Sequence, residues 1–224
     1  MPVATIERLS TKLPGLKLMN CYGATETTSP STIMPGELTA AHLDSVGLPC
    51  PGAQIIVVDA DGHELPRGEI GEIWIHGGSV IKGYWNNPKA TAESFTGGFW
   101  HSGDLGSIDA RNLVRVFDRQ KDMINRGGLK IYSAEVEFVL AGHVDVVESA
   151  IIAKSCPVLG ERVHAVIVAR NSDASIEGLR AWCAERLSDY KVPETITLTA
   201  EPLPRNANGK VMKRQLRDAL ARVQ

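Results

Sequence analysis

The chain has 224 residues, of which 43% are hydrophobic and 22% are charged, and its formal net charge is −2. This usage is typical of globular proteins, and it leaves no broad basic field for nucleic acid and no polybasic membrane anchor. The longest apolar runs are too short for a transmembrane segment, and the first residues lack the apolar region of a secretory signal. Four widely spaced cysteines without a Cys-x-x-Cys pair favour reduced thiols in a cytoplasmic protein over a zinc site or a disulfide framework.

The first half of the sequence predicts short strands joined by turns, with one clear helix. The run "AQIIVV" ends in an Asp-Gly turn, and "GEIGEIWIHGG" alternates Ile70, Ile73 and Ile75 with polar or small residues. The segment "NLVRVFDR" is a further strand candidate. A helix is expected in "NNPKATAESF", with Asn87 as its N-cap and Pro88 at its first position. This half therefore predicts a β-rich unit.

After Lys121 the pattern changes to helices that alternate with short strands, and we expect the domain boundary there. Helices are predicted in "SAEVEFVLAGH", with Ser133 as its cap, and in "SIEGLRAWCAERLSDY", with Ser175 as its cap. Strands are predicted in "ESAIIAKS", "VHAVIVAR" and "ETITLTA". A last helix, "VMKRQLRDALARV", is expected to turn four side chains inward: Met212, Leu216, Leu220 and Val223. These elements make a compact α+β domain of about one hundred residues.

Four polar clusters lie within this framework: "YGATE", "HSGDLG", "DRQKDMINRGGLKIY" and "PRNANGK". Each has an ordinary explanation when it is taken alone. On this reading the first cluster is a polar turn, and Asp104 lies in another turn where it bonds its own backbone. Arg119 is then an ordinary solvated charge on the surface. The alternative for the first cluster is a phosphate site whose Glu26 carboxylate binds a metal. Because short motifs match often by chance, the decision depends on their combination.

In their order and separations these clusters, together with "GEIWIHGGSVIKGYWNNP", resemble the acyl- and aryl-CoA synthetases of the adenylate-forming (AMP-binding) superfamily. The resemblance covers almost the whole chain but less than half of a typical member. It implies an α+β fold, with a β-rich C-terminal remnant of the large adenylation domain over residues 1–120. A small mobile C-terminal domain would follow over residues 121–224.

The resemblance also implies that this chain is the C-terminal portion of a longer synthetase. The family's Ser/Thr/Gly-rich phosphate loop, which ends in Pro-Lys-Gly, has no counterpart among the residues before Tyr22. We therefore expect the chain to be inactive by itself. The apolar surface of its incomplete large domain is expected to be exposed or buried in an oligomer.

The resemblance implies roles for particular residues on both parts of the chain. Six fall in the nucleotide site: Tyr22 against adenine with Gly23 beside it, Thr25 at the α-phosphate, Glu26 on Mg²⁺, and Asp104 with Arg119 on the ribose. In the second part, Lys121 falls on the family's hinge. Gly127 and Gly128 fall on a hairpin that meets the pantetheine arm of coenzyme A, and Lys210 falls on the lysine that drives adenylation.

The implied chemistry joins two anions, because a carboxylate must attack the α-phosphate of ATP and expel pyrophosphate. At about 4 Å and an effective dielectric of about 20, each pair of unit charges repels by about 4 kcal/mol. Mg²⁺ on Glu26 and the ammonium of Lys210 would offset this repulsion. The expected function is thus that of an ATP-dependent carboxylate–CoA ligase, such as a fatty acyl-CoA synthetase, acting through an acyl-adenylate and then a CoA thioester.

Two other functions stay open at this point. The chain could be a non-catalytic remnant that serves as an interaction or regulatory module. Nucleic-acid binding through "GKVMKRQLR" is disfavoured, because these charges suit the solvated face of an amphipathic helix. The intact set of family residues favours the ligase, with ATP or AMP, Mg²⁺, coenzyme A and a carboxylic acid as its ligands.

Overall fold

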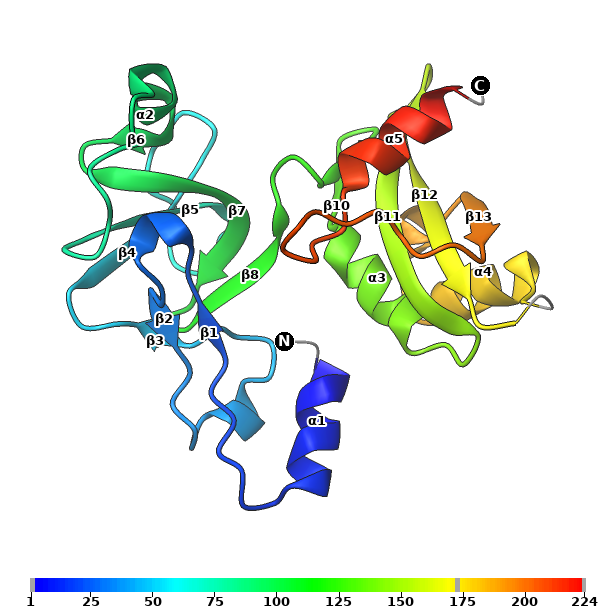
Figure 1. Cartoon of the computed structure of the whole chain (residues 1–224), viewed down its shortest axis with the longest axis horizontal. Helices are drawn as coiled ribbons and strands as arrows, with labels where there is room; N and C mark the ends of the chain where they lie inside the picture. Colours follow the sequence, from blue (N-terminus) through cyan, green and yellow to red (C-terminus); the bar gives the residue numbers. More distant parts are fainter. Residues whose placement is uncertain (1–2, 172–173, 223–224) are drawn as a thin grey trace. The chain divides into compact units, whose positions relative to one another are not determined.

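The computed structural model of the chain describes residues 3–171 and 174–222. The chain divides into two compact units, Met1–Gln120 and Lys121–Gln224, and each is described by itself (Figure 1). Among the described residues, no helix has the length and apolar character needed to cross a membrane. All four cysteines are free thiols.

The first unit is built mainly from short strands. Its elements are α1 (Val3–Lys12), β1 (Cys21–Tyr22), the 3-10 helix η1 (Thr25–Thr27), β2 (Thr32–Ile33), η2 (Thr39–Ala41), β3 (Leu48–Pro49), β4 (Ala53–Val58), β5 (Gly71–Gly77), α2 (Pro88–Ser94), β6 (Phe95–Thr96), β7 (Phe99–Ile108) and β8 (Val114–Arg119). The strands β1, β2 and β3 form a small antiparallel sheet. A five-stranded antiparallel sheet has the order β4-β5-β7-β6, with β8 also paired to β7.

The core of the first unit lies against the five-stranded sheet. Ile73 and Ile75 of β5 are fully buried there, as the alternating pattern predicts. Ile70 departs from that prediction, because it precedes β5 and is 40% exposed. The alternation therefore begins only where β5 starts to pair with β4.

The two helices of the first unit differ in how well the sequence predicts them. The prediction of α2 is confirmed: Pro88 occupies its first position, and the Asn87 side chain accepts a hydrogen bond from the Ala90 N–H at 3.1 Å. The helix α1 was not predicted. Its ten residues are fewer than an isolated helix needs for stability, so its local signal is weak, and burial of Ile6 ties it to the unit.

The second unit contains one five-stranded sheet between helices. Its elements are β9 (Ile124–Arg126), β10 (Leu129–Ile131), α3 (Ser133–Ala141), β11 (Val146–Cys156), β12 (Gly160–Ala169), α4 (Ile176–Ala184), η3 (Asp189–Lys191), β13 (Thr195–Thr199) and α5 (Lys213–Arg222). The strand order is β10-β9-β12-β11, and β13 pairs with β12 in the parallel direction.

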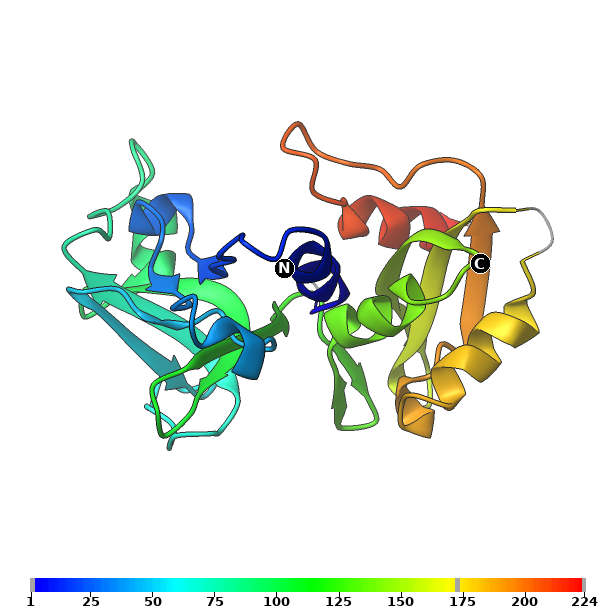
Figure 2. The same cartoon turned by 90° about the horizontal axis from the view of Figure 1, so that it is seen from below.

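Alternate residues of the central strands pack on opposite faces of this sheet. Ile151 and Ile167 contact the apolar sides of α3 and α4, whereas Ile152 and Val166 lie on the face that α5 covers. Figure 2 shows the two helices on one side and α5 on the other. Leu216 and Leu220 of α5 pack on this sheet as predicted. Met212 was also expected to point inward, but it precedes α5 and Val211 packs on the cluster in its place, while Val223 lies outside the described residues.

Two helix boundaries differ from the sequence prediction. Ser133 is the first residue of α3 and not its cap; the N-cap is Tyr132, which makes no side-chain capping bond. The Ser133 hydroxyl instead accepts a hydrogen bond from Lys213 Nζ at 2.6 Å. In α4 the predicted cap is confirmed, because Ser175 Oγ accepts the Gly178 N–H, but the helix ends at Ala184, whereas the predicted segment runs to Tyr190. Leu187 and Tyr190, which follow the end of α4, still pack on the core.

Candidate functional site

A tyrosine, a carboxylate and a guanidinium from three strands meet in the first unit. Tyr22 Oη donates to Asp104 Oδ2 at 2.6 Å, and Arg119 Nε lies 3.2 Å from Asp104 Oδ1. Burial, and then the negative charge of Asp104, raise the pKa of Tyr22 far above its ordinary value, so its hydroxyl remains a donor. Asp104 is 9% exposed, whereas half of the Arg119 side chain is exposed. One carboxylate thus holds two partners, one on each oxygen.

The pairing of Asp104 with Arg119 depends on an irregularity between β7 and β8. From Gly106 to Ile108 the register is regular, but it shifts by one residue between Leu105 and Gly106. After this bulge Asp104 lies opposite Arg119, and Asp118 lies opposite Leu105. Without the extra residue, two aspartates would face each other across the strands, which is destabilising. Bulges of this kind redirect side chains beside functional sites.

A second set of contacts fixes the backbone just before Asp104. Glu72 Oε1 accepts the Gly103 N–H at 2.9 Å, and Glu72 Oε2 accepts Trp74 Nε1 at 3.0 Å. The ring of His101 stacks on Trp74 with centroids 3.9 Å apart, and burial lowers the pKa of His101. The sequence did not predict that Glu72 and Trp74 support the backbone beside Asp104. Their signal was present, since they alternate with the buried isoleucines of β5 and must lie on its other face.

The segment that carries Glu26 is a single turn of 3-10 helix. Thr27 Oγ1 accepts the Ala24 N–H at 3.0 Å and donates to the Ala24 carbonyl, which closes the turn. Glu26 is half-buried and Thr25 is exposed. The Glu26 carboxylate accepts a hydrogen bond from Tyr84 Oη at 2.9 Å. Neither this bond nor a role for Tyr84 was predicted.

Gly23 lies where the chain folds closely back on itself. A Cβ atom at this position would lie 2.9 Å from Ser29 Oγ and 3.0 Å from Ser31 N. Ser31 N also donates to the Tyr22 carbonyl at 2.8 Å. Close packing of the backbone therefore accounts for this glycine without any ligand.

In the second unit, Gly127 and Gly128 form the two-residue turn of a hairpin. Their φ angles are 58° and 91°, and Leu129 pairs with Arg126 on either side of the turn. Positive φ at both central residues defines a type I′ turn, which non-glycine residues other than Asn and Asp adopt at a cost. The Gly127 N–H donates to the Leu159 carbonyl at 2.8 Å, so the hairpin is tied to the turn between β11 and β12.

Lys210 is exposed on a loop whose backbone is held firmly. Asn206 Oδ1 accepts the Lys210 N–H at 2.9 Å, and the Asn206 N–H donates to the Lys210 carbonyl at 3.0 Å. Arg205 forms an ion pair with Glu148 and donates to the Gly209 carbonyl at 2.6 Å. Among the described residues, none pairs with the Lys210 ammonium. The loop therefore presents a free cation on a fixed support.

Lys121 lies in an exposed turn at the start of the second unit. The next residue, Asp122, accepts a hydrogen bond from Arg217 of α5 at 3.1 Å, which anchors the beginning of this unit. The sequence-predicted site residues thus fall into two groups. One group lies on the first unit around Glu26 and Asp104, and the other lies on the second unit around the glycine hairpin and the loop of Lys210.

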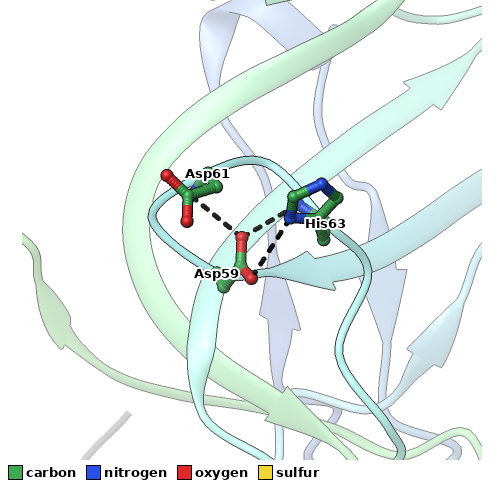
Figure 3. A group of neighbouring side chains, drawn as sticks. All are labelled: Asp59, Asp61 and His63. Carbon is green, nitrogen blue, oxygen red and sulfur yellow. Dashed lines mark hydrogen bonds and ion pairs between the residues drawn. The ribbon is translucent and has the colours of Figure 1, made fainter.

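Two other polar groups of the first unit have structural explanations. Asp59, Asp61 and His63 bring potential ligand atoms within 4.8 Å of one another (Figure 3). However, Asp59 Oδ1 accepts the N–H groups of Asp61 and His63, both at 2.9 Å, and the bond from His63 is the main cause of the lowered pKa of Asp59. This exposed group is a turn that follows β4, and we assign no metal to it.

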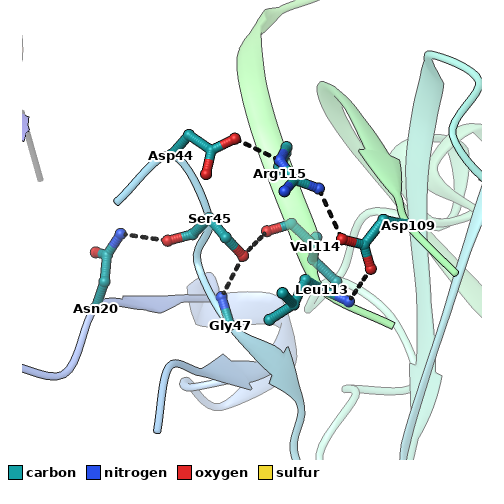
Figure 4. Close-up of polar contacts among 8 residues, drawn as sticks. All are labelled: Asn20, Asp44, Ser45, Gly47, Asp109, Leu113, Val114 and Arg115. Atoms are coloured by element: carbon teal, nitrogen blue, oxygen red, sulfur yellow. Dashed lines mark hydrogen bonds and ion pairs between the residues drawn. The ribbon is translucent and has the colours of Figure 1, made fainter. Parts of the chain in front are cut away.

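The second group ties a loop to the start of β8 (Figure 4). Arg115 binds Asp44 at 2.5 Å and Asp109 at 3.1 Å, and these two carboxylates raise the pKa of the Arg115 guanidinium. Ser45 Oγ donates to the Val114 carbonyl at 2.7 Å. These contacts fix the strand that carries Arg119 at its other end.

An open groove of about 520 Å³ lies beside the small sheet of the first unit. Its apolar lining includes Met19, Ile33 and Leu48, and the charged residues Lys17 and Glu37 also line it. Met19 is 54% exposed. Nothing in the structure shows what covers this surface, so the expected burial in an oligomer stays a prediction.

Comparison with known proteins gives two family matches on this chain. The AMP-binding enzyme family matches residues 1–85, and the AMP-binding enzyme C-terminal domain matches residues 135–210. The long-chain-fatty-acid–CoA ligase of Yersinia pestis is 36% identical over 225 residues, covering 100% of this chain and 40% of the ligase. The 2-succinylbenzoate–CoA ligase of Geobacillus kaustophilus is 38% identical over 207 residues, covering 92% of this chain and 42% of the ligase.

Solved structures give the same result. The o-succinylbenzoate CoA synthetase of Bacillus subtilis in complex with its acyl-adenylate intermediate has a TM-score of 0.90 and 35% identity, over 97% of this chain and 44% of that protein. A structure of the same enzyme with ATP and a magnesium ion has a TM-score of 0.89. The expected α+β fold is confirmed, and the chain spans about two fifths of the length of these relatives. The chain belongs to the AMP-binding enzyme family, in its acyl- and aryl-CoA synthetase branch.

Proposed function

We propose that this chain carries part of an ATP-dependent carboxylate–CoA ligase, which activates a carboxylic acid as its adenylate and then transfers the acyl group to coenzyme A. The observation that carries the proposal is the contact of Tyr22 and Arg119 with the single carboxylate of Asp104. Three residues that the resemblance assigns to one nucleoside come from distant parts of the sequence. Their meeting is what a nucleotide site requires.

We assign the ribose of the nucleotide to Asp104 and Arg119, and the adenine to the ring of Tyr22. An ionised carboxylate accepts hydrogen bonds and suits the two hydroxyls of a ribose. The half-exposed Arg119 side chain can reach a ligand while it offsets the charge of Asp104. Tyr22 is half-buried, with its hydroxyl fixed on Asp104, so its ring orientation is set before a ligand arrives.

We assign Mg²⁺ to Glu26 and the α-phosphate to the exposed hydroxyl of Thr25, which lie side by side on the 3-10 turn. The donor type fits, since magnesium prefers carboxylate oxygens and phosphates over nitrogen or sulfur. When bound, the ion would stabilise negative charge on the phosphate oxygens. One of the similar solved structures contains ATP and a magnesium ion, which supports this assignment.

We assign the ammonium of Lys210 to the charge that develops when the acid attacks the α-phosphate. Removal of one such preorganised donor typically costs about 2.7 to 4 kcal/mol of barrier. Rotation of the second unit about Lys121 would withdraw Lys210 from the nucleotide after adenylation. It would bring the hairpin of Gly127 and Gly128 to the pantetheine arm of coenzyme A instead. This sequence of poses is part of the proposal.

The test is titration of the 224-residue chain with AMP by calorimetry. We expect binding that Asp104→Asn weakens at least tenfold, as for loss of a hydrogen bond to a charged group of about 1.5 to 3 kcal/mol. The matched control is Asp61→Asn, which removes the same charge from an exposed turn of the same unit. Equal affinity in the two variants would contradict the ribose assignment.

The same titration separates the ligase from the alternative of a non-catalytic interaction module, which predicts the fold without AMP binding. Because no Ser/Thr/Gly-rich phosphate loop is present in this sequence, we expect no carboxylate-dependent ATP–pyrophosphate exchange from the 224-residue chain alone. Robust exchange from the pure chain would overturn that expectation.

A further inference from the structure

We propose that Tyr84 is a positioning residue that orients the Glu26 carboxylate toward its cation; this inference rests on the proposed role of Glu26. Tyr84 Oη donates to Glu26 Oε1 at 2.9 Å, across 58 positions of sequence. Tyr84 belongs to the "KGYW" segment, for which the sequence predicts no role. Its ring carries a fixed donor to one oxygen of a half-buried carboxylate.

The position of Tyr84 is set by the helix that follows it and not by Glu26. Its N–H donates to Thr91 Oγ1 at 2.9 Å, and Thr91 Oγ1 donates in turn to the Asn87 carbonyl at 2.9 Å. Its ring meets Phe95 edge-on with centroids 6.0 Å apart. A Cβ atom at Gly83 would lie 2.6 Å from the Thr91 side chain, so the loop packs closely on α2. The Tyr84 hydroxyl is therefore presented from a rigid support.

The chain is tied to the same loop at Glu26 and two residues after it. The Ile81 N–H donates to the Glu26 carbonyl at 2.8 Å, and Thr28 Oγ1 donates to the Ser79 carbonyl at 2.7 Å. These two bonds hold the main chain of the 3-10 turn. What they leave free is rotation of the Glu26 side chain, and the bond from Tyr84 restricts that rotation.

A hydroxyl is a suitable partner for a carboxylate that must also bind a cation. It donates to Oε1 without adding positive charge, whereas an arginine or lysine would repel the metal. No partner of Oε2 is found within the described part of the chain, so this oxygen is available. Hydrogen bonds to metal-binding carboxylates typically change metal affinity or activity by about 10- to 100-fold.

The test measures how much a metal ion contributes to ATP binding. Calorimetry gives the affinity of the 224-residue chain for ATP in MnCl₂ and in EDTA, and the ratio of the two is compared among wild type, Tyr84→Phe, Glu26→Gln and Trp85→Phe. The last variant is the control, because Trp85 is the next residue and is 92% exposed. We expect Tyr84→Phe to lower the ratio by about 10- to 100-fold, with unchanged melting temperature and unchanged AMP affinity, and Trp85→Phe to retain the wild-type ratio.

The other outcomes separate this inference from the proposed function. If Glu26→Gln loses the metal effect and Tyr84→Phe retains it, the positioning role is wrong and the metal assignment stands. If wild type shows no metal effect, or Glu26→Gln retains it, both fail, because Glu26 is then not a ligand. If Tyr84→Phe lowers the melting temperature and the AMP affinity together, Tyr84 only packs the loop and the inference is overturned.

Discussion

We expect His164 to make the second unit sensitive to acid. It lies on β12 and is 3% exposed, with Nδ1 2.7 Å from Thr195 Oγ1 and Nε2 3.2 Å from Thr197 Oγ1. Burial, and to a lesser extent the charge of Lys154, lowers the pKa of His164 from 6.5 to about 4. It shares a sheet face with Val166, on the side that α5 covers. Protonation in the folded state therefore places a charge in a buried position, where the positive charge of Lys154 also disfavours it.

The magnitude follows from the difference between the folded and unfolded pKa values. Because the folded pKa of His164 is the lower one, the stabilising contribution is complete above pH 6.5 and is lost as the pH falls toward 4. At about 1.36 kcal/mol per pH unit, the whole interval corresponds to roughly 3 kcal/mol. That is a large part of the total of about 5 to 15 kcal/mol that stabilises a typical domain.

The assay is urea unfolding of the chain at pH 7 and pH 4.5, for wild type and for His164→Gln. Glutamine is uncharged at both values, so the variant should lose less stability on acidification than wild type, by most of those roughly 3 kcal/mol. His63→Gln is the control, because the His63 side chain is 80% exposed. Equal pH dependence of wild type and His164→Gln would refute the reasoning, as would an NMR titration of His164 with a midpoint near 6.5.

Two further predictions concern the backbone of the second unit. Gly128→Ala should destabilise the chain by about 1 kcal/mol or more, because alanine is strained at a φ of 91°, and a urea midpoint equal to that of wild type would contradict the type I′ assignment. Arg205→Ala removes the ion pair with Glu148 and the bond to the Gly209 carbonyl, so amide hydrogen exchange over residues 204–212 should accelerate. Unchanged exchange there would show that the loop of Lys210 is held without Arg205.

The sequence predicts those features of the fold that arise from local signals. The cap and first residue of α2 were predictable because Asn87 and Pro88 act within one turn. The burial of Ile73 follows from simple alternation along β5. Ser133 shows the limit of such signals, since its hydroxyl is taken by Lys213, a residue 80 positions away, and no local pattern indicates that bond.

The contacts of the site were less predictable because they depend on register and on distant segments. Cross-strand pairing can be predicted from turn length when the spacing is regular. The bulge between β7 and β8 changes the residue opposite Asp104 from Asp118 to Arg119, and no local signal indicates it. The bond from Tyr84 to Glu26 depends on how the loop packs on α2. The motifs predict which residues form the site. The contacts that these residues make with one another depend on the folded structure.

The two carboxylates of the first unit are held in different ways, and the difference agrees with their proposed ligands. Asp104 is nearly buried, and Arg119 offsets its charge while Tyr22 donates to its other oxygen. Such a carboxylate can accept neutral hydroxyls without attracting a second cation. Glu26 has no cationic side chain within ion-pair distance among the described residues, and Tyr84 supplies only a hydroxyl. Its negative charge is left uncompensated, which favours a bound metal ion at Glu26 and a sugar diol at Asp104.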